Sequence, residues 1–81
     1  MARYGKFVDL EPSVVLARAA RYFGEEGVGL TLRERDDRHV ILEGAGGFVA
    51  VSATPTEDDR TNVDLMTREW DIAVRDFMGK L

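Results

Sequence analysis

Cysteine is absent from this chain of 81 residues, and histidine occurs only once, as His39. A chain without thiols forms neither disulfides nor thiolate metal sites and has no cysteine nucleophile, and a single histidine excludes a multi-histidine metal site. No apolar run reaches the roughly 18 residues needed to cross a bilayer, and residues 1–15 lack the apolar block of a signal peptide. We therefore expect a cytoplasmic protein that binds no metal and no cofactor.

Positive charge is also scarce, because 11 Lys and Arg stand against 15 Asp and Glu and give a net charge of −4. This sign repels phosphate backbones unless the basic residues gather on one face. The one local basic cluster, Arg33, Arg35 and Arg38, alternates with acidic residues and is typical of a solvated turn. We expect neither a nucleic-acid partner nor a membrane partner.

The composition is 44% apolar and 32% charged, which is typical of a folded globular domain. Chains divide into several domains only well beyond about 250 residues, so residues 1–81 are expected to form a single domain. A chain of this length buries roughly 63% of its unfolded surface on folding. We therefore expect a core that is only just large enough to stabilise the fold, and a bound partner would add to the buried surface.

The spacing of apolar residues predicts two helices. Apolar residues recur at spacings of three and four after Pro12, and Gly24 and Gly27 favour a helix end, which predicts a helix over residues 12–26. Thr67 is a good N-cap for a second helix. That helix carries a stripe typical of a core-facing surface, formed by Trp70, Ala73, Val74, Phe77, Met78 and Leu81.

Alternating patterns between these helices predict strands. Polar or glycine-rich turns are expected at residues 36–38, 44–47 and 55–60. The predicted fold is α+β with the order β-α-β-β-β-β-α, an antiparallel curved sheet with both helices packed on one face. The expected strands cover residues 3–10, 30–35, 39–43, 48–54 and 62–66.

The strand registers can be predicted because a slip of one residue would turn each apolar set away from the helices. We place Leu32 opposite Leu42, Leu42 opposite Val49, and Val51 opposite Val63. The loop before the last strand would then have seven residues. This register puts nine apolar residues on the helix-covered face: Leu30, Leu32, Val40, Leu42, Val49, Val51, Ala53, Val63 and Leu65.

The same register leaves a polar sheet face with an apolar centre, where Ile41 lies opposite Ala50 and Phe48 opposite Met66. A patch of a few hundred Å² on a monomer tends to be functional, and its burial at about 25 cal/mol per Å² would stabilise an assembly by several kcal/mol. We predict a non-enzymatic module that forms a homodimer or binds a protein partner through this face. The simpler alternative is that scattered apolar residues on a sheet face need no partner. The predicted contact residues are Ile41, Phe48, Ala50 and Met66, with Arg33, Glu43 and Asp64 at the rim.

The element order and the helix over residues 70–81 resemble the helix-grip arrangement, also described as the TATA-binding-protein-like fold. The resemblance covers nearly the whole chain. Larger helix-grip proteins of the START and pollen-allergen type hold apolar ligands between the sheet and the last helix. The resemblance therefore implies an alternative function as a carrier of a small apolar ligand, in a pocket formed by Trp70, Phe77 and Phe23.

Catalytic chemistry has one candidate, in which His39 and either Glu43 or Asp64 form an acid/base site. Exposed carboxylates seldom acquire the shifted pKa that catalysis needs. The acidic run at residues 57–59 lacks the ligand spacing of a calcium loop, and the glycine-rich residues 44–47 lack the following Lys-Ser/Thr of a phosphate loop. We predict no catalytic residues and no metal ligands.

Overall fold

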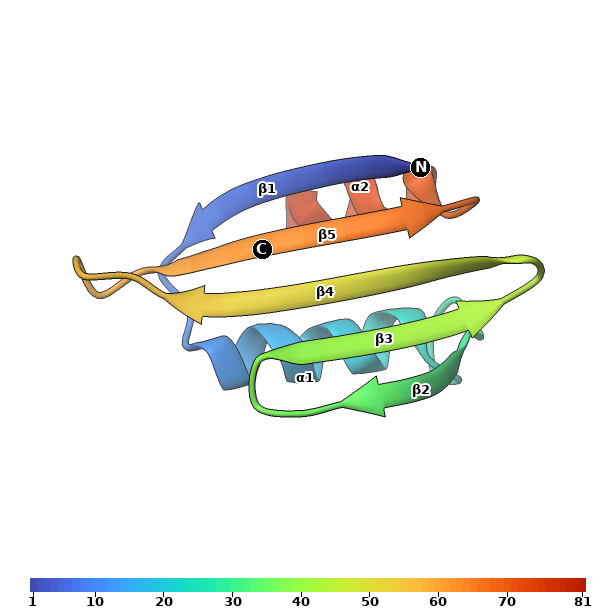
Figure 1. Cartoon of the computed structure of the whole chain (residues 1–81), viewed down its shortest axis with the longest axis horizontal. Helices are drawn as coiled ribbons and strands as arrows, with labels where there is room; N and C mark the ends of the chain where they lie inside the picture. Colours follow the sequence, from blue (N-terminus) through green and yellow to red (C-terminus); the bar gives the residue numbers. More distant parts are fainter.

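The computed structural model describes residues 1–81, and its strands form one open, curved antiparallel sheet in the order β1-β5-β4-β3-β2. Both helices pack on the same face of this sheet (Figure 1). The predicted α+β class and element order are confirmed. The elements are β1 (Ala2–Val8), α1 (Pro12–Phe23), β2 (Thr31–Arg35), β3 (His39–Gly44), β4 (Gly47–Pro55), β5 (Thr61–Arg68) and α2 (Asp71–Lys80).

The first helix forms where its periodicity predicts, but it ends at Phe23 and not at residue 26. Pro12 stands in the first turn, where its missing N–H costs nothing. Gly24 accepts hydrogen bonds from the amides of both Gly27 and Gly29 and turns the chain toward β2. The buried side of α1 consists of Pro12, Val15, Leu16, Ala19 and Phe23.

The predicted N-cap role of Thr67 is wrong, because this residue continues β5. Thr67 is fully buried opposite Val49, and its hydroxyl donates to the carbonyl oxygen of Phe48 at 2.7 Å. The chain reverses at Glu69, whose φ is 79°. The second helix starts only at Asp71, whose carboxylate lies in the first turn, where the helix dipole favours negative charge.

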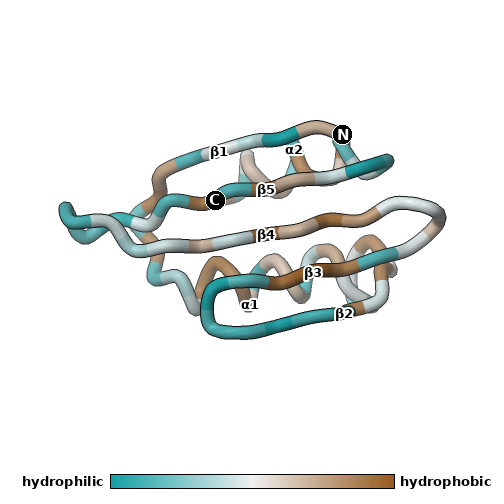
Figure 2. Tube along the Cα trace, viewed as in Figure 1, coloured by the Kyte–Doolittle hydropathy of each residue, from teal (hydrophilic) through white to brown (hydrophobic).

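The hydrophobic core lies between the helices and the covered face of the sheet. Every apolar residue predicted on this face is buried except Leu32, which is 46% exposed. Two features expose Leu32: β2 lies at the sheet edge, beyond the cover of α1, and a bulge interrupts its pairing between Leu32 and Glu34. Figure 2 shows hydrophobic colour in the middle of β3 and in part of β4, and hydrophilic colour along most of β2.

The predicted pairing of β3 with its neighbours is confirmed, since Leu42 lies opposite both Leu32 and Val49. The turn between β3 and β4 has two central residues, Ala45 and Gly46, both with positive φ, as a tight hairpin turn requires. This turn is shorter than the predicted four-residue loop.

The predicted register of β4 against β5 is wrong by two residues, because Val51 lies opposite Leu65 and not Val63. The connecting loop covers only residues 56–60, closed by a hydrogen bond of 2.8 Å from the Thr56 amide to the Arg60 carbonyl. Because the shift is an even number of residues, every side chain keeps its predicted face.

The second helix is tied to the edge strand β1 as well as to β5. The Tyr4 hydroxyl donates to Asp71 at 3.1 Å, at the beginning of α2, and Lys6 Nζ donates to the Met78 carbonyl at 2.9 Å, near its end. A lysine at a helix C-terminus also matches the helix dipole. Neither helix is long and apolar enough to cross a membrane.

Candidate functional site: the open face of the sheet

The sheet face opposite the helices, here called the open face, carries its side chains in rows that follow the cross-strand pairs. Three adjacent rows are named here, two after one of their members and one after its central place. The phenylalanine row holds Thr31, Glu43, Phe48 and Arg68; the central row holds Glu34, Ile41, Ala50, Met66 and Arg3; the histidine row holds His39, Ser52, Asp64 and Gly5.

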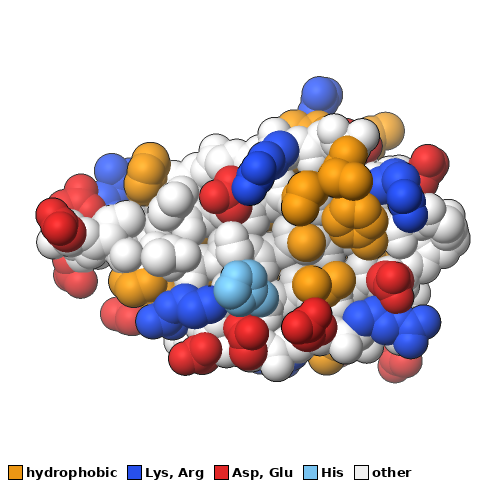
Figure 3. All heavy atoms as spheres, viewed as in Figure 1, with side chains coloured by type: hydrophobic (Ala, Val, Ile, Leu, Met, Phe, Trp, Pro, Cys, Tyr) orange, Lys and Arg blue, Asp and Glu red, His pale blue; other side chains and the backbone are white.

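The four predicted contact residues do gather at the centre of the open face. Ile41, Ala50 and Met66 are consecutive in the central row, and Phe48 lies in the next row. Phe48 pairs with Arg68 and not with Met66, as the corrected register requires. All four side chains are half-buried in the isolated chain. Figure 3 shows the hydrophobic atoms as a continuous group over β3, β4 and β5.

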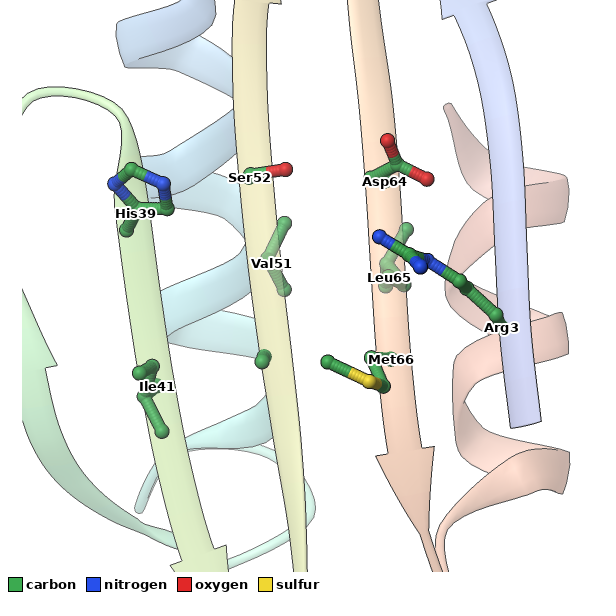
Figure 4. A pocket seen from close by; sticks show the side chains of 9 residues that line it. Arg3, His39, Ile41, Val51, Ser52, Asp64, Leu65 and Met66 are labelled. Carbon is green, nitrogen blue, oxygen red and sulfur yellow. The ribbon is translucent and has the colours of Figure 1, made fainter. Parts of the chain in front are cut away.

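The small side chains of β4 leave a shallow hollow of about 160 Å³ in this face. Figure 4 shows Arg3 reaching from β1 over β5, and the Met66 side chain lying toward β4. The hollow is smaller than the roughly 300 Å³ of an ordinary ligand pocket. It is therefore better described as a recess in a contact surface. Its lining is Arg3, His39, Ile41, Ala50, Val51, Ser52, Asp64, Leu65 and Met66.

The charged residues around the apolar centre divide largely by sign, with Arg33 among the acidic residues and Asp64 among the basic ones. Glu43 and Glu34 lie on the side formed by β2 and β3, whereas Arg3 and Arg68 lie on the side formed by β1 and β5. Glu43 accepts a hydrogen bond from Arg33 Nε at 2.6 Å, so two predicted rim residues form one exposed ion pair. We call these two sides of the open face the acidic side and the basic side.

Arg3 and Arg68, the two cations of the basic side, were not anticipated from the sequence. The position of Arg3 depends on β1 pairing with β5, the most distant strand in the chain. The prediction of Thr67 as an N-cap places Arg68 in the second helix, whereas β5 includes it. Its guanidinium lies 5.6 Å from the ring centre of Phe48. The alternation of residues 3–8 could have placed Arg3 on one face of β1, but not beside Met66.

His39 does not lie beside Glu43, and its closest carboxylate is the nearby Asp36. His39 Nδ1 is 3.2 Å from Asp36 Oδ1, and the same oxygen accepts the backbone amides of Arg38 and His39. These hydrogen bonds, the Arg38 amide foremost, lower the pKa of Asp36 below its ordinary value of 3.8. Asp64 shares the histidine row with His39 but is separated from it by Ser52. This arrangement braces a turn and resembles no catalytic constellation.

The residues predicted to form a ligand pocket lie on the helix side and fill much of the space between sheet and helices. Phe23 and Phe77 are buried with ring centres 5.1 Å apart, and Trp70 Nε1 donates to the Gly44 carbonyl at 3.1 Å. Two open hollows, of about 360 and 440 Å³, lie instead on either side of Tyr22 between α1 and α2. Phe77 borders the first hollow and Trp70 the second.

Together the fold and the open face define a small α+β protein whose five-stranded antiparallel sheet is covered by helices on one face only. No protein-family model matches the chain, and no curated protein or solved structure is significantly similar to it. The helix-grip resemblance accordingly stays a prediction.

Proposed function

We propose that this protein is a non-enzymatic module that self-associates through the open face. The observation that carries the proposal is the continuous apolar centre formed by Ile41, Phe48, Ala50 and Met66, which neither helix covers. Apolar side chains gathered on one sheet face favour removal from water, because their burial is stabilising in proportion to the area removed.

The size of the face suits a second copy of the chain. The molecule extends over 38 by 21 Å in the plane of the view of Figure 3. This footprint of the whole molecule is roughly 800 Å², an upper limit on the area that one copy can bury, and each partner in a standard interface contributes about that much. Association costs of about 4 to 15 kcal/mol offset most of the apolar gain, so a dissociation constant of about 1 to 100 μM is expected.

Light scattering coupled to size exclusion tests the proposal over a range of protein concentrations. The mass of the wild-type chain should approach that of a dimer at about 1 mM, ten-fold above the weakest expected dissociation constant, and Phe48→Asp should show the mass of a monomer, because a carboxylate cannot be left unpaired in an apolar contact. Ile72→Asp is the matched control, since Ile72 is 78% exposed on the helix side. It should remain a dimer. A wild-type chain that is monomeric at this concentration would refute the proposal.

A second candidate function is the binding of a small apolar ligand on the helix side. The hollows beside Tyr22 favour it, because their volumes of about 360 and 440 Å³ lie in the range of ligand sites. They differ from the predicted pocket in lying between α1 and α2, not between the sheet and α2. Aromatic side chains, Trp70 among them, provide apolar walls.

Native mass spectrometry of freshly expressed protein tests the ligand function. A carrier should retain a bound molecule, and Ala73→Phe should lose it, because Ala73 borders the larger hollow and a phenyl ring would fill part of it. Ala17→Phe is the matched control at an exposed position of α1. Wild-type protein without any bound mass, and without binding of an apolar fluorescent dye, would contradict a carrier.

A further inference from the structure

We infer that two copies stack open face on open face about a two-fold axis parallel to β4, so that the acidic side of each copy lies over the basic side of the other. This inference rests on the proposed self-association and adds the geometry of the pair. It follows from the distribution of charge on the open face together with the symmetry of a homodimer.

Two identical sheets that pack face to face have two simple choices for an in-plane two-fold axis. An axis along the strands reverses the strand order, so that β3 lies over β5 of the partner and each row stays over the same row. An axis across the strands places each strand over its own copy and exchanges the rows. The two choices bring different charges together.

With the axis along β4, opposite charges meet in two of the three rows. In the phenylalanine row, Glu43 lies over the partner's Arg68, and in the central row Glu34 lies over the partner's Arg3. In the histidine row, His39 lies over the partner's Asp64. The axis across the strands, passing through the central row, would place Glu34 over the partner's Glu34 and Arg3 over the partner's Arg3. Among these residues it would bring only Arg68 and the partner's Asp64 together as opposite charges. Complementary charge fixes the orientation of an interface, so the first choice is favoured.

The charged side chains are available for such contacts. Arg3, Glu34 and Asp64 form no ion pair within their own chain. The Glu43 side chain remains 52% exposed beside Arg33. Arg68 lies over the Phe48 ring, and a guanidinium stacked on a ring keeps its N–H edge free for a carboxylate.

The same axis also superimposes the apolar centres. Phe48 and Ala50, both on β4, meet their own copies near the axis, and Ile41 meets the partner's Met66. The flexible thioether side chain can bend into the hollow of about 160 Å³ beside Ala50. Packed sheets cross at about 30°, which separates the outer strands but keeps the contact around the axis.

Charge reversal tests the pairing of Glu43 with the partner's Arg68. Arg68→Glu should raise the dissociation constant at least about ten-fold at low salt, because two attractive contacts become repulsive, and Arg68→Glu with Glu43→Arg should restore it to within about three-fold. Arg18→Glu, an exposed change of equal charge on the helix side, should leave it within about two-fold. An axis across the strands predicts no rescue, since residue 68 would then face the partner's Asp64, and residue 43 would lie over the partner's His39 instead.

Distances between spin labels test the axis directly. The chain has no cysteine, so Thr54→Cys and Thr31→Cys each give a single labelling site on the open face. For the axis along β4, backbone separations of about 10 Å at residue 54 and about 20 Å at residue 31 are expected. For the axis across the strands, the corresponding values are about 30 and 17 Å.

Failure of the inferred axis and failure of the proposed self-association would give different results in these experiments. Dipolar coupling with the longer distance at residue 54 would overturn the inferred axis while leaving self-association standing. Absence of coupling at both sites, together with a monomeric mass, would overturn the proposed function and the inference with it. Coupling with the shorter distance at residue 54 supports both.

Discussion

The two faces of the sheet differ in how completely their apolar residues leave water, although the same strands supply both. Leu42 is fully buried under α1, whereas its neighbour Ile41 is only half-buried on the open face. Two short helices can cover only one face of a five-stranded sheet. A chain of this size therefore completes a single core and leaves a second apolar surface that its own elements do not reach.

Truncation of Leu42 and of Ile41 should show the largest difference in stability between the two faces. Leu42→Ala should lower the free energy of unfolding by about 3 kcal/mol, because it leaves a cavity in a closed core, whereas Ile41→Ala should cost less than about 1 kcal/mol. Urea unfolding at low protein concentration measures the monomer. Equal losses for the two variants would mean that the faces do not differ in this way.

Protein concentration should change the stability of the chain only through contacts of the open face. A dimer that forms only from folded chains stabilises them by mass action, by about 2.7 kcal/mol at a hundred-fold excess over the dissociation constant. The midpoint of thermal unfolding of the wild type should rise by several degrees as the protein concentration increases from the dissociation constant to a hundred-fold excess over it. Phe48→Asp should abolish the dependence, and a wild-type midpoint independent of concentration would contradict self-association.

A smaller difference in stability is expected between substitutions of two threonines on opposite faces of the sheet, Thr67 and Thr54. Thr67→Val removes a buried hydroxyl that donates to the Phe48 carbonyl, and should cost about 1 kcal/mol because the oxygen loses its partner. Thr54→Val, at an exposed position of the open face, should change stability by less than about 0.5 kcal/mol. Thermal unfolding of the two variants side by side decides the matter.

The smallest expected effect concerns the turn before β3. The folded chain depresses the pKa of Asp36, so the ionised carboxylate contributes stability above the ordinary value of 3.8, and this contribution is lost as the pH falls through the folded pKa. Asp36→Asn keeps the acceptor oxygen but cannot titrate. Unfolding of the variant should therefore depend less on pH than unfolding of the wild type as the pH falls from about 5 to below 3.8. Identical profiles would exclude this role for Asp36.

Local pattern was enough to predict the α+β class, the faces of the central strands and the four residues of the apolar centre. Pairings closed by short connections were predictable where a turn couples adjacent strands, as for Leu42 opposite Val49. The register of β4 against β5 was not, because a shift of two residues keeps every side chain on its face and leaves the hydrophobic pattern unchanged. Leu32 was misplaced because pattern alone does not reveal how far a helix covers an edge strand.

The alternation of apolar residues by itself determined which side chains share a face, since burial requires them to turn together toward the helices. Only the tertiary structure decided that β1 lies beside β5 and that Arg68 still belongs to a strand. These two facts create the basic side of the open face. They depend on contacts between residues far apart in the chain, whose closure is governed by the packing of the whole domain and not by any local pattern.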